Sequence, residues 1–400
     1  MADYDILIAG AGPVGSALAV ALADGRRRIA VVDATTTREP PASDRSIALA
    51  SGSVRLLQAL GVWDVLAAQA SPIHRVEVSQ RGWPGRTRID AAEEGVVALG
   101  RVVGYAALGQ ALAAHARAAP GVEWFAPAAV EAADAGDAAI QLRLALAAGE
   151  REIDSRLAVA AEGTHSPLRG LLGIGVDEHD YEQTALLLDV EAGGEATTAH
   201  ERFTRAGTLA LLPRGGSRRT LVWAQPAATA AHWQAAAPGE LRDEVARLLG
   251  GELAPVRLAG APVAYPLKRV EARTLIAARG AVIGNAARTL HPVAAQGFNL
   301  ALRDACALAE RLLPAADPGA PAVLAEWRRA RALDRWLTRG FTDALARGLG
   351  HGPALLEGPR AGALLGLDLC RGGRHLLAAQ TMGLASGLPR VGTWRPEGAA

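Results

Sequence analysis

A glycine-rich segment near the start of the chain could hold a phosphate group. Gly10, Gly12 and Gly15 follow an apolar run at residues 5–9. Glycines at this spacing allow a tight turn, a close backbone approach to a pyrophosphate, and close packing of a helix on a strand. A helix that begins near Pro13 would direct its free N–H groups and the positive end of its dipole at the phosphates. The pattern predicts a dinucleotide site formed by Gly10, Ala11, Gly12, Pro13 and Gly15.

Asp33 supports this interpretation. It ends the second apolar run, residues 28–33, at a place from which a carboxylate can bond a ribose hydroxyl. The alternative is an ordinary strand–helix turn that binds nothing, and the order of strand, glycines, helix and acidic residue disfavours it. This segment alone does not distinguish FAD from NAD.

A second segment, residues 284–305, is rich in polar residues and does distinguish them. The amide of Asn285 could bond a ribityl or phosphate oxygen. Pro292 would stiffen a turn, and residues 296–299 would open a helix whose N–H groups could face the electron-rich pyrimidine of a flavin. A loop that only packs a helix would need no such run. The flavin-binding residues predicted here are Asn285, Gln296, Gly297, Phe298 and Asn299.

His291 and Pro292 are the candidates for the catalytic edge of this site, with a purely structural His291 as the alternative. No His, Cys or carboxylate cluster has the spacing of metal ligands, so no metal is predicted. Cys306 and Cys370 are interpreted as small buried apolar residues in a reducing cytosol. No Ser–His–Asp or Cys–His signature for a protein nucleophile is evident.

The elements that position these residues indicate an α/β protein. A strand, a glycine turn, a helix and a second strand over residues 4–33 form a βαβ unit, which a polar loop at residues 34–50 follows. After residue 175, short strands with Gly-rich turns indicate an antiparallel sheet. A strand at 279–283 and a long helix at 297–313 return the chain to the first domain.

The predicted architecture is therefore a Rossmann-like cofactor-binding domain with an inserted, mainly antiparallel β substrate domain and a helical C-terminal region. The predicted domains are residues 1–70, 100–175 and 276–320 for the cofactor, 71–99 and 176–275 for the substrate, and 321–400 for the helical region.

Composition and charge narrow the class of protein. The 400 residues are half hydrophobic and carry a net charge of +1 with the charges interspersed, so no nucleic-acid partner is expected. The chain opens without a signal sequence, and no apolar stretch reaches the length of a membrane span. We expect a cytoplasmic protein, with peripheral association at the inner face of the cell membrane as the alternative.

The segment at 284–305 resembles the flavin-binding segment of the single-component FAD aromatic hydroxylases. Within them it is most similar to the ubiquinone-biosynthesis branch, specifically the 2-polyprenyl-6-methoxyphenol hydroxylases. Residues 44–53 resemble that branch's arginine loop, which implies that Arg45 lies beside the flavin. The resemblance covers about residues 4–390. Strands of the branch's substrate domain are resembled by residues 181–183, 210–213 and 221–223.

This resemblance implies an FAD-dependent monooxygenase. NAD(P)H would reduce FAD as a transient co-substrate, and O₂ would supply the hydroxyl group added to an electron-rich ring. The implied substrate is 2-polyprenyl-6-methoxyphenol, converted to the 1,4-benzoquinol of the ubiquinone pathway, with a ubiquinone-biosynthesis complex as a further partner. The alternatives are hydroxylation of another phenol, a flavoprotein reductase of isoprenoid double bonds, and an FAD-bound assembly partner without activity.

Several positions depart from the family pattern, among them Asn285, Arg288 and Gly104-Tyr105, and two further ones concern the cofactor site directly. Glu162-Gly163 stands where the superfamily usually has Asp-Gly, and both residues are assigned to the cofactor site. Ala295 stands where the branch usually has Gly. A Cβ atom at residue 295 would crowd the flavin if the backbone there needs a positive φ.

The C-terminal region suggests a contact with a membrane. Residues 352–389 contain leucine pairs with arginines nearby, as an interfacial helix needs in order to bury one face among acyl chains and meet anionic headgroups. The alternative is that these leucines pack on the protein's own core.

Overall fold

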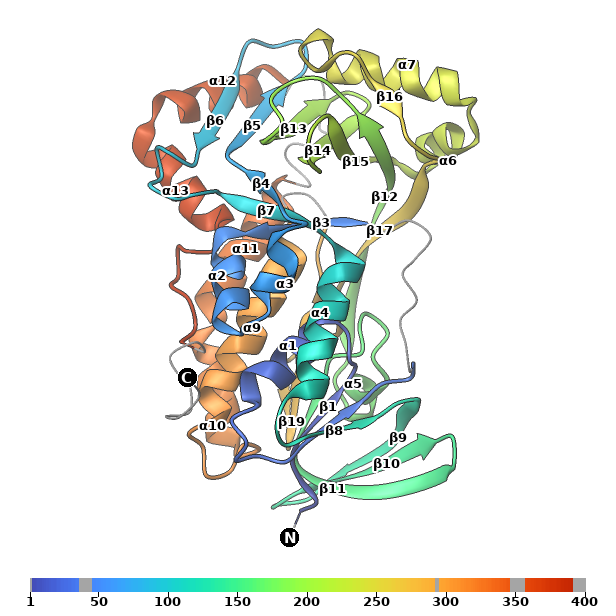
Figure 1. Cartoon of the computed structure of the whole chain (residues 1–400), viewed down its shortest axis with the longest axis vertical. Coiled ribbons are helices and arrows are strands. Elements are labelled where there is room, and N and C mark those ends of the chain that lie inside the picture. Colours follow the sequence, from blue (N-terminus) through green and yellow to red (C-terminus); the bar gives the residue numbers. More distant parts are fainter. Residues whose placement is uncertain (1, 36–44, 292–294, 346–356, 391–400) are drawn as a thin grey trace.

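The computed structural model describes residues 2–35, 45–291, 295–345 and 357–390. Figure 1 shows two large β-sheets at opposite ends of an elongated molecule, with most of the helices of the first domain between them. The predicted fold class is confirmed: an α/β cofactor-binding fold carries a second, mainly antiparallel sheet and a helical C-terminal region.

The first sheet is mainly parallel and has the order β18-β19-β11-β1-β2-β8, with β10 and β9 extending from β11. Its central strand β1 (Tyr4–Ala9) pairs in parallel with β2 and β11, and five of its six residues are buried. A continuous apolar run is what a strand covered on both faces requires. The other strands are β2 (Ile29–Val32), β8 (Val122–Phe125), β9 (Ala128–Ala135), β10 (Ile140–Leu146), β11 (Gly149–Ala160), β18 (Ile276–Ala277) and β19 (Gly280–Val282).

Helices cover this sheet and share one core with it. The helix α1 (Pro13–Leu22) starts directly after β1 and packs against α4 (Tyr105–Ala118) and α9 (Gln296–Leu312). Pro13 at the first helical position favours this start, because its missing N–H would have had no partner there. The remaining helices of this part are α2 (Ser51–Ala59), α3 (Trp63–Ala67), α5 (Pro167–Leu171), α8 (Gly284–Ala287) and α10 (Pro321–Ala330).

The second sheet has the order β20-β17-β12-β15-β14-β13-β5-β6. One face packs on α6 (Ala227–Ala235) and α7 (Pro238–Leu249) through a cluster that includes Leu209, Leu221 and Trp223. The other face points toward the first domain and lines a cavity. Its strands are β5 (Arg75–Gln80), β6 (Arg86–Asp90), β12 (Val176–Glu191), β13 (Thr198–Thr204), β14 (Gly207–Pro213), β15 (Arg218–Pro226), β16 (Arg257–Leu258), β17 (Val263–Ala272) and β20 (Arg288–Thr289).

A small sheet and the C-terminal helices complete the wall between the two large sheets. The small sheet has the order β3-β7-β4, from β3 (Ser46–Ala50), β4 (Ser71–Ile73) and β7 (Gly100–Gly104). The helix α11 (Ala332–Leu345) packs on α9, whereas α12 (Glu357–Leu369) and α13 (Arg371–Thr381) pack against β6, on the upper left of Figure 1. Among the described residues, no helix is long and apolar enough to cross a membrane.

Three local predictions were wrong. Cys370 was expected to be buried but is exposed, whereas Cys306 is buried as expected. Residues 46–50 were expected to belong to a polar loop, but they form β3, because β7 supplies an antiparallel partner 50 to 58 positions along the chain. Asn285 was expected in a loop and lies instead in the one-turn helix α8.

Candidate active site

The glycine segment forms the turn between β1 and α1. Gly10 has a φ of +99°, and a Cβ atom there would lie 2.5 Å from the carbonyl oxygen of Ala161. A Cβ atom on Gly15 would lie 1.9 Å from the carbonyl oxygen of Gly10. These two glycines are therefore required by the packing itself. Gly12 is different: its φ of −64° is open to any residue, and it lies at the N-terminus of α1 on the cavity wall.

Asp33 holds this turn from behind. One carboxylate oxygen accepts a hydrogen bond from the backbone N–H of Ala11 at 2.6 Å, and the other accepts two from Thr35, at 2.9 Å from N–H and 2.7 Å from the hydroxyl. A contact between this carboxylate and a ribose hydroxyl is expected from the position of Asp33 directly after β2. That contact stays a prediction.

The predicted site residues gather around one cavity of about 820 Å³, near the upper end of the range of about 300–1,000 Å³ for ligand pockets. Four of them do not line it, namely Gly10, Ala11, Gly15 and Asp33, and Pro292 lies outside the described residues. The predicted residues in the wall itself are Gly12, Pro13, Arg45, Glu162, Gly163, Asn285, His291, Gln296, Gly297, Phe298 and Asn299.

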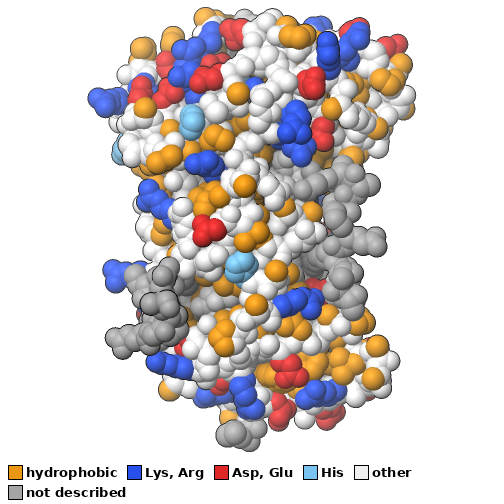
Figure 2. Space-filling model, in the orientation of Figure 1, with side chains coloured by type: hydrophobic (Ala, Val, Ile, Leu, Met, Phe, Trp, Pro, Cys, Tyr) orange, Lys and Arg blue, Asp and Glu red, His pale blue; other side chains and the backbone are white. Residues whose placement is uncertain are grey.

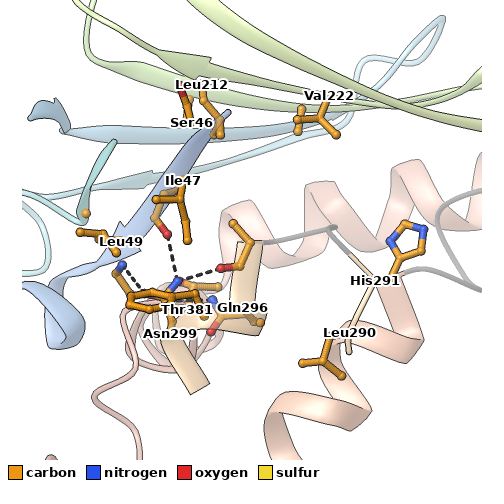
Figure 3. Close-up of a pocket in the computed structure, with 18 of the residues that line it drawn as sticks. Ser46, Ile47, Leu49, Leu212, Val222, Leu290, His291, Gln296, Asn299 and Thr381 are labelled. Atoms are coloured by element: carbon orange, nitrogen blue, oxygen red, sulfur yellow. Dashed lines mark hydrogen bonds between the residues drawn. The ribbon is translucent and has the colours of Figure 1, made fainter. Parts of the chain in front are cut away.

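The start of α9 is fixed to two other elements by side-chain amides. The oxygen of Asn299 accepts from the N–H of Ala50 at 2.9 Å, and its nitrogen donates to the carbonyl of Ala48 at 2.9 Å (Figure 3). The Gln296 nitrogen donates to the carbonyl of Thr381 in α13 at 3.1 Å. The Asn299 amide is thus engaged by backbone and positions the helix start against β3. Direct contact of residues 296–299 with a flavin ring stays a prediction.

Ala295 precedes this helix in the left-handed conformation, with φ 49° and ψ 35°. That conformation costs an L-residue about 1–2 kcal/mol and is free for glycine. The positive φ considered for this position is therefore present in a residue that carries a Cβ atom.

Two glycines of the wall leave their backbone open to a ligand. A Cβ atom on Gly163 or on Gly297 would meet no protein atom within 4 Å, and both residues line the cavity. Together with the free N–H groups at the start of α1, such bare backbone suits a bound dinucleotide cofactor. The residues present therefore fit FAD.

Glu162 lines the cavity, and its carboxylate caps the start of α5. It accepts hydrogen bonds from the hydroxyl of Ser166 and from the N–H of Leu168, the latter at 3.1 Å. Burial raises the pKa of this carboxyl group, although both hydrogen bonds act against that shift. The longer carboxylate in place of Asp is thus held by the protein itself.

Two further polar wall residues, Arg45 and His291, contact aromatic or amide neighbours. The Arg45 guanidinium lies 4.1 Å from the centre of the Tyr105 ring, a cation–π distance. His291 is buried, with Nε2 3.2 Å from the side-chain oxygen of Gln183 and its ring edge-on to Tyr181 at 5.0 Å. Asn285 is exposed in α8. Figure 3 shows His291 and Leu290 on a segment apart from Asn299, with the cavity between them and Leu212.

Sequence reasoning missed a second group of wall residues. Leu364, Leu367 and Leu377 reach the cavity from α12 and α13, and Glu201 reaches it from β13. The sequence contained a signal for the β13 residues only. Ala199, Glu201 and Phe203 alternate along a strand, which places their side chains on one face of the sheet.

A family model described as an FAD binding domain matches residues 3–337. The chain belongs to this FAD-binding family. It is 35% identical to "Ubiquinone hydroxylase UbiL" of Rhodospirillum rubrum, with 86% of this chain and 81% of that protein aligned. It is 31% identical to "3-demethoxyubiquinol 3-hydroxylase" of Escherichia coli, over 87% of this chain and 90% of that one.

Solved structures share the fold over almost the whole chain. The p-nitrophenol 4-monooxygenase PnpA of Pseudomonas putida superposes with a TM-score of 0.78, covering 95% of this chain and 98% of that one, at 17% identity. With the family and these relatives, the chain is a flavoprotein monooxygenase whose cofactor is FAD.

Proposed function

We propose that this monooxygenase hydroxylates a polyprenylated phenol, 2-polyprenyl-6-methoxyphenol, to the 1,4-benzoquinol in ubiquinone biosynthesis, with NAD(P)H and O₂ as co-substrates. One observation carries the proposal: the predicted flavin segments and a broad apolar sheet face line the same cavity. A ring with a hydrocarbon tail needs such a wall, because burial of apolar surface contributes about 25 cal/mol per Å². The apolar wall includes Val76, Val78, Ile89, Ala199, Leu212, Val222, Leu364, Leu367 and Leu377.

The chain's own residues bind, orient and shield. The N–H groups at the start of α1 face the place proposed for the diphosphate, and the start of α9 faces the place proposed for the flavin ring. Bound FAD would accept the reducing equivalents of NAD(P)H and activate O₂, which provides the oxygen atom of the new hydroxyl group. The apolar wall excludes water from that chemistry, and a phenol's own oxygen activates the ring without a protein nucleophile.

Substrate-dependent turnover tests the proposal. NAD(P)H oxidation by the purified enzyme should rise on addition of the prenylated phenol and consume one O₂ per molecule of quinol formed. Turnover without O₂ would indicate a reductase of isoprenoid double bonds, and an FAD-loaded protein without turnover would indicate an assembly partner. Lipid extracts of a deletion strain should accumulate the unhydroxylated phenol, and a different precursor would reassign the ring position or the substrate.

The proposed contact with a membrane, or with a ubiquinone-biosynthesis complex, concerns the outer face of α12 and α13. Leu365, Leu369 and Leu376 are 46%, 78% and 69% exposed, whereas Leu364, Leu367 and Leu377 of the same helices line the cavity. These two helices therefore separate the cavity from an apolar outer face. Figure 2 shows basic, acidic and apolar side chains close together at the upper left, where Figure 1 places α12 and α13. A substrate with negligible aqueous concentration would be taken from the bilayer at such a place.

Partitioning onto anionic liposomes tests this contact. The double variant Leu369→Glu with Leu376→Glu should bind at least about tenfold more weakly than the unchanged protein, because two leucines lose about 1.5–3 kcal/mol each of apolar burial. Leu377 is unsuitable for the test because it belongs to the cavity wall. Val65→Glu, at a residue 57% exposed in α3, is the matched control and should bind as before. Equal binding by all three proteins would leave a protein partner as the alternative occupant.

A further inference from the structure

A single carboxylic acid interrupts the apolar sheet face of the cavity. Strand β13 presents Ala199, Glu201 and Phe203 to the cavity in alternation. On the neighbouring strands the residues directly opposite Glu201 are Val78 of β5 and Ala210 of β14. Cross-strand neighbours dominate the surroundings of a sheet side chain, so this carboxyl group lies among hydrocarbon.

The Glu201 carboxyl group has no bonding partner among the residues that the structure describes. Oxygen Oε1 is buried without a hydrogen-bond partner, and no basic side chain of the described residues pairs with this group. Burial raises its pKa to about 8, so the group is mainly uncharged at neutral pH. An uncharged carboxyl group carries one hydrogen to donate and oxygen lone pairs to accept with, and Glu201 is one of the residues that line the cavity.

A structural role would leave a different pattern. Three buried carboxylates of the described chain pair with arginines: Asp334 pairs with Arg303 and Arg331, Asp304 with Arg331 and Arg335, and Glu77 with Arg86 and Arg88. A polar group left unpaired on the wall of a cavity opposes folding, and a ligand that pairs with it recovers that cost.

The geometry points to Glu201 as the residue that binds the ring hydroxyl of the phenolic substrate. This assignment rests on the proposed function. An ortho-methoxyphenol presents a hydroxyl donor beside an ether acceptor, which complements the acceptor and donor of an uncharged carboxyl group. When the hydroxyl and methoxy oxygens of the phenol bind at Glu201 of β13, the apolar wall of the cavity remains available for the polyprenyl tail. Glu201 thereby selects phenols over purely apolar rings and fixes which ring edge faces the flavin segments.

Binding of two matched probes to the FAD-loaded enzyme tests the assignment. The probes are a 2-methoxyphenol with a short prenyl chain and its methyl ether, in which the hydroxyl is blocked. Titration calorimetry should show about tenfold tighter binding of the phenol, as one hydrogen bond at a buried group contributes. Glu201→Leu should bind both probes alike and retain full FAD content. Glu201→Gln should keep the preference, because an amide retains a donor and an acceptor.

The outcomes of this experiment distinguish the assignment of Glu201 from the proposed function. A Glu201→Leu enzyme that still prefers the phenol tenfold would overturn the assignment and leave the proposed function standing, as would a wild type that binds both probes equally. A Glu201→Gln enzyme that behaves like Glu201→Leu, or loss of FAD in both variants, would also overturn the assignment. A wild type that binds neither probe would overturn the proposed function together with it.

Discussion

Replacing Gly12 with valine should give a folded protein that has lost FAD. Gly12 has an ordinary φ of −64° and stands at the start of α1 on the cavity wall. A branched side chain there would occupy the approach of the pyrophosphate to the helix N–H groups. Loss of two charge-assisted hydrogen bonds, at about 1.5–3 kcal/mol each, weakens FAD binding by at least about 100-fold. Flavin absorbance per protein measures the loss, and circular dichroism checks the fold.

Three other glycines make this experiment specific. The same change at Gly10 or Gly15 should unfold the protein, because the added Cβ would lie 2.5 Å and 1.9 Å from backbone oxygens. Gly239→Val is the matched control, since a Cβ at that residue meets nothing within 4 Å and Gly239 lies in α7, which packs on the second sheet. A yellow, fully loaded Gly12→Val protein would refute the assignment of this turn to the cofactor.

The fold was predictable where its signals are local. The βαβ opening could be predicted because apolar runs, glycines and Pro13 act within a few residues of one another, and β1, α1 and β2 follow that pattern. The long helix predicted at residues 297–313 is present as α9 at Gln296–Leu312. Strand β3 could not be predicted, since its stability depends on β7, a partner distant in sequence.

The candidate site likewise has one wall that local motifs predict and another that depends on contacts distant in sequence. Motif spacing placed Gly12, Asn285 and residues 296–299 on one wall, and the structure brings them to one cavity. The opposite wall depends on how two sheets face each other. Alternation in β13 indicates that Ala199, Glu201 and Phe203 share a face, but only the assembled sheet shows that this face meets the first domain and not α6 and α7.

A buried ionic cluster offers the largest predicted effect on stability. Asp334 of α11 pairs with Arg303 of α9 at 2.9 Å and with Arg331, while Asp304 pairs with Arg331 at 2.8 Å and with Arg335 at 3.0 Å. All five residues are buried. The cluster therefore joins α11 to the helix whose start forms the cavity wall.

Asp334→Ala should lower the free energy of unfolding by about 3–5 kcal/mol, because it leaves Arg303 as a buried charge without its carboxylate. Burial alone would raise the pKa of Asp334, but Arg303 and Arg331 outweigh it and lower that pKa. A lowered pKa contributes stability that is present above the unfolded value of about 4 and is lost as the pH falls through the folded value. Urea unfolding at pH 7 and in acid should show a difference in the free energy of unfolding between the unchanged protein and Asp334→Ala that shrinks below about pH 4.

Asp177→Ala is the matched control, since Asp177 and Arg273 form a pair 69% and 67% exposed. This change should lower the free energy of unfolding by no more than about 1 kcal/mol. Equal losses for the two variants at pH 7 would show that the cluster does not hold α11 on α9.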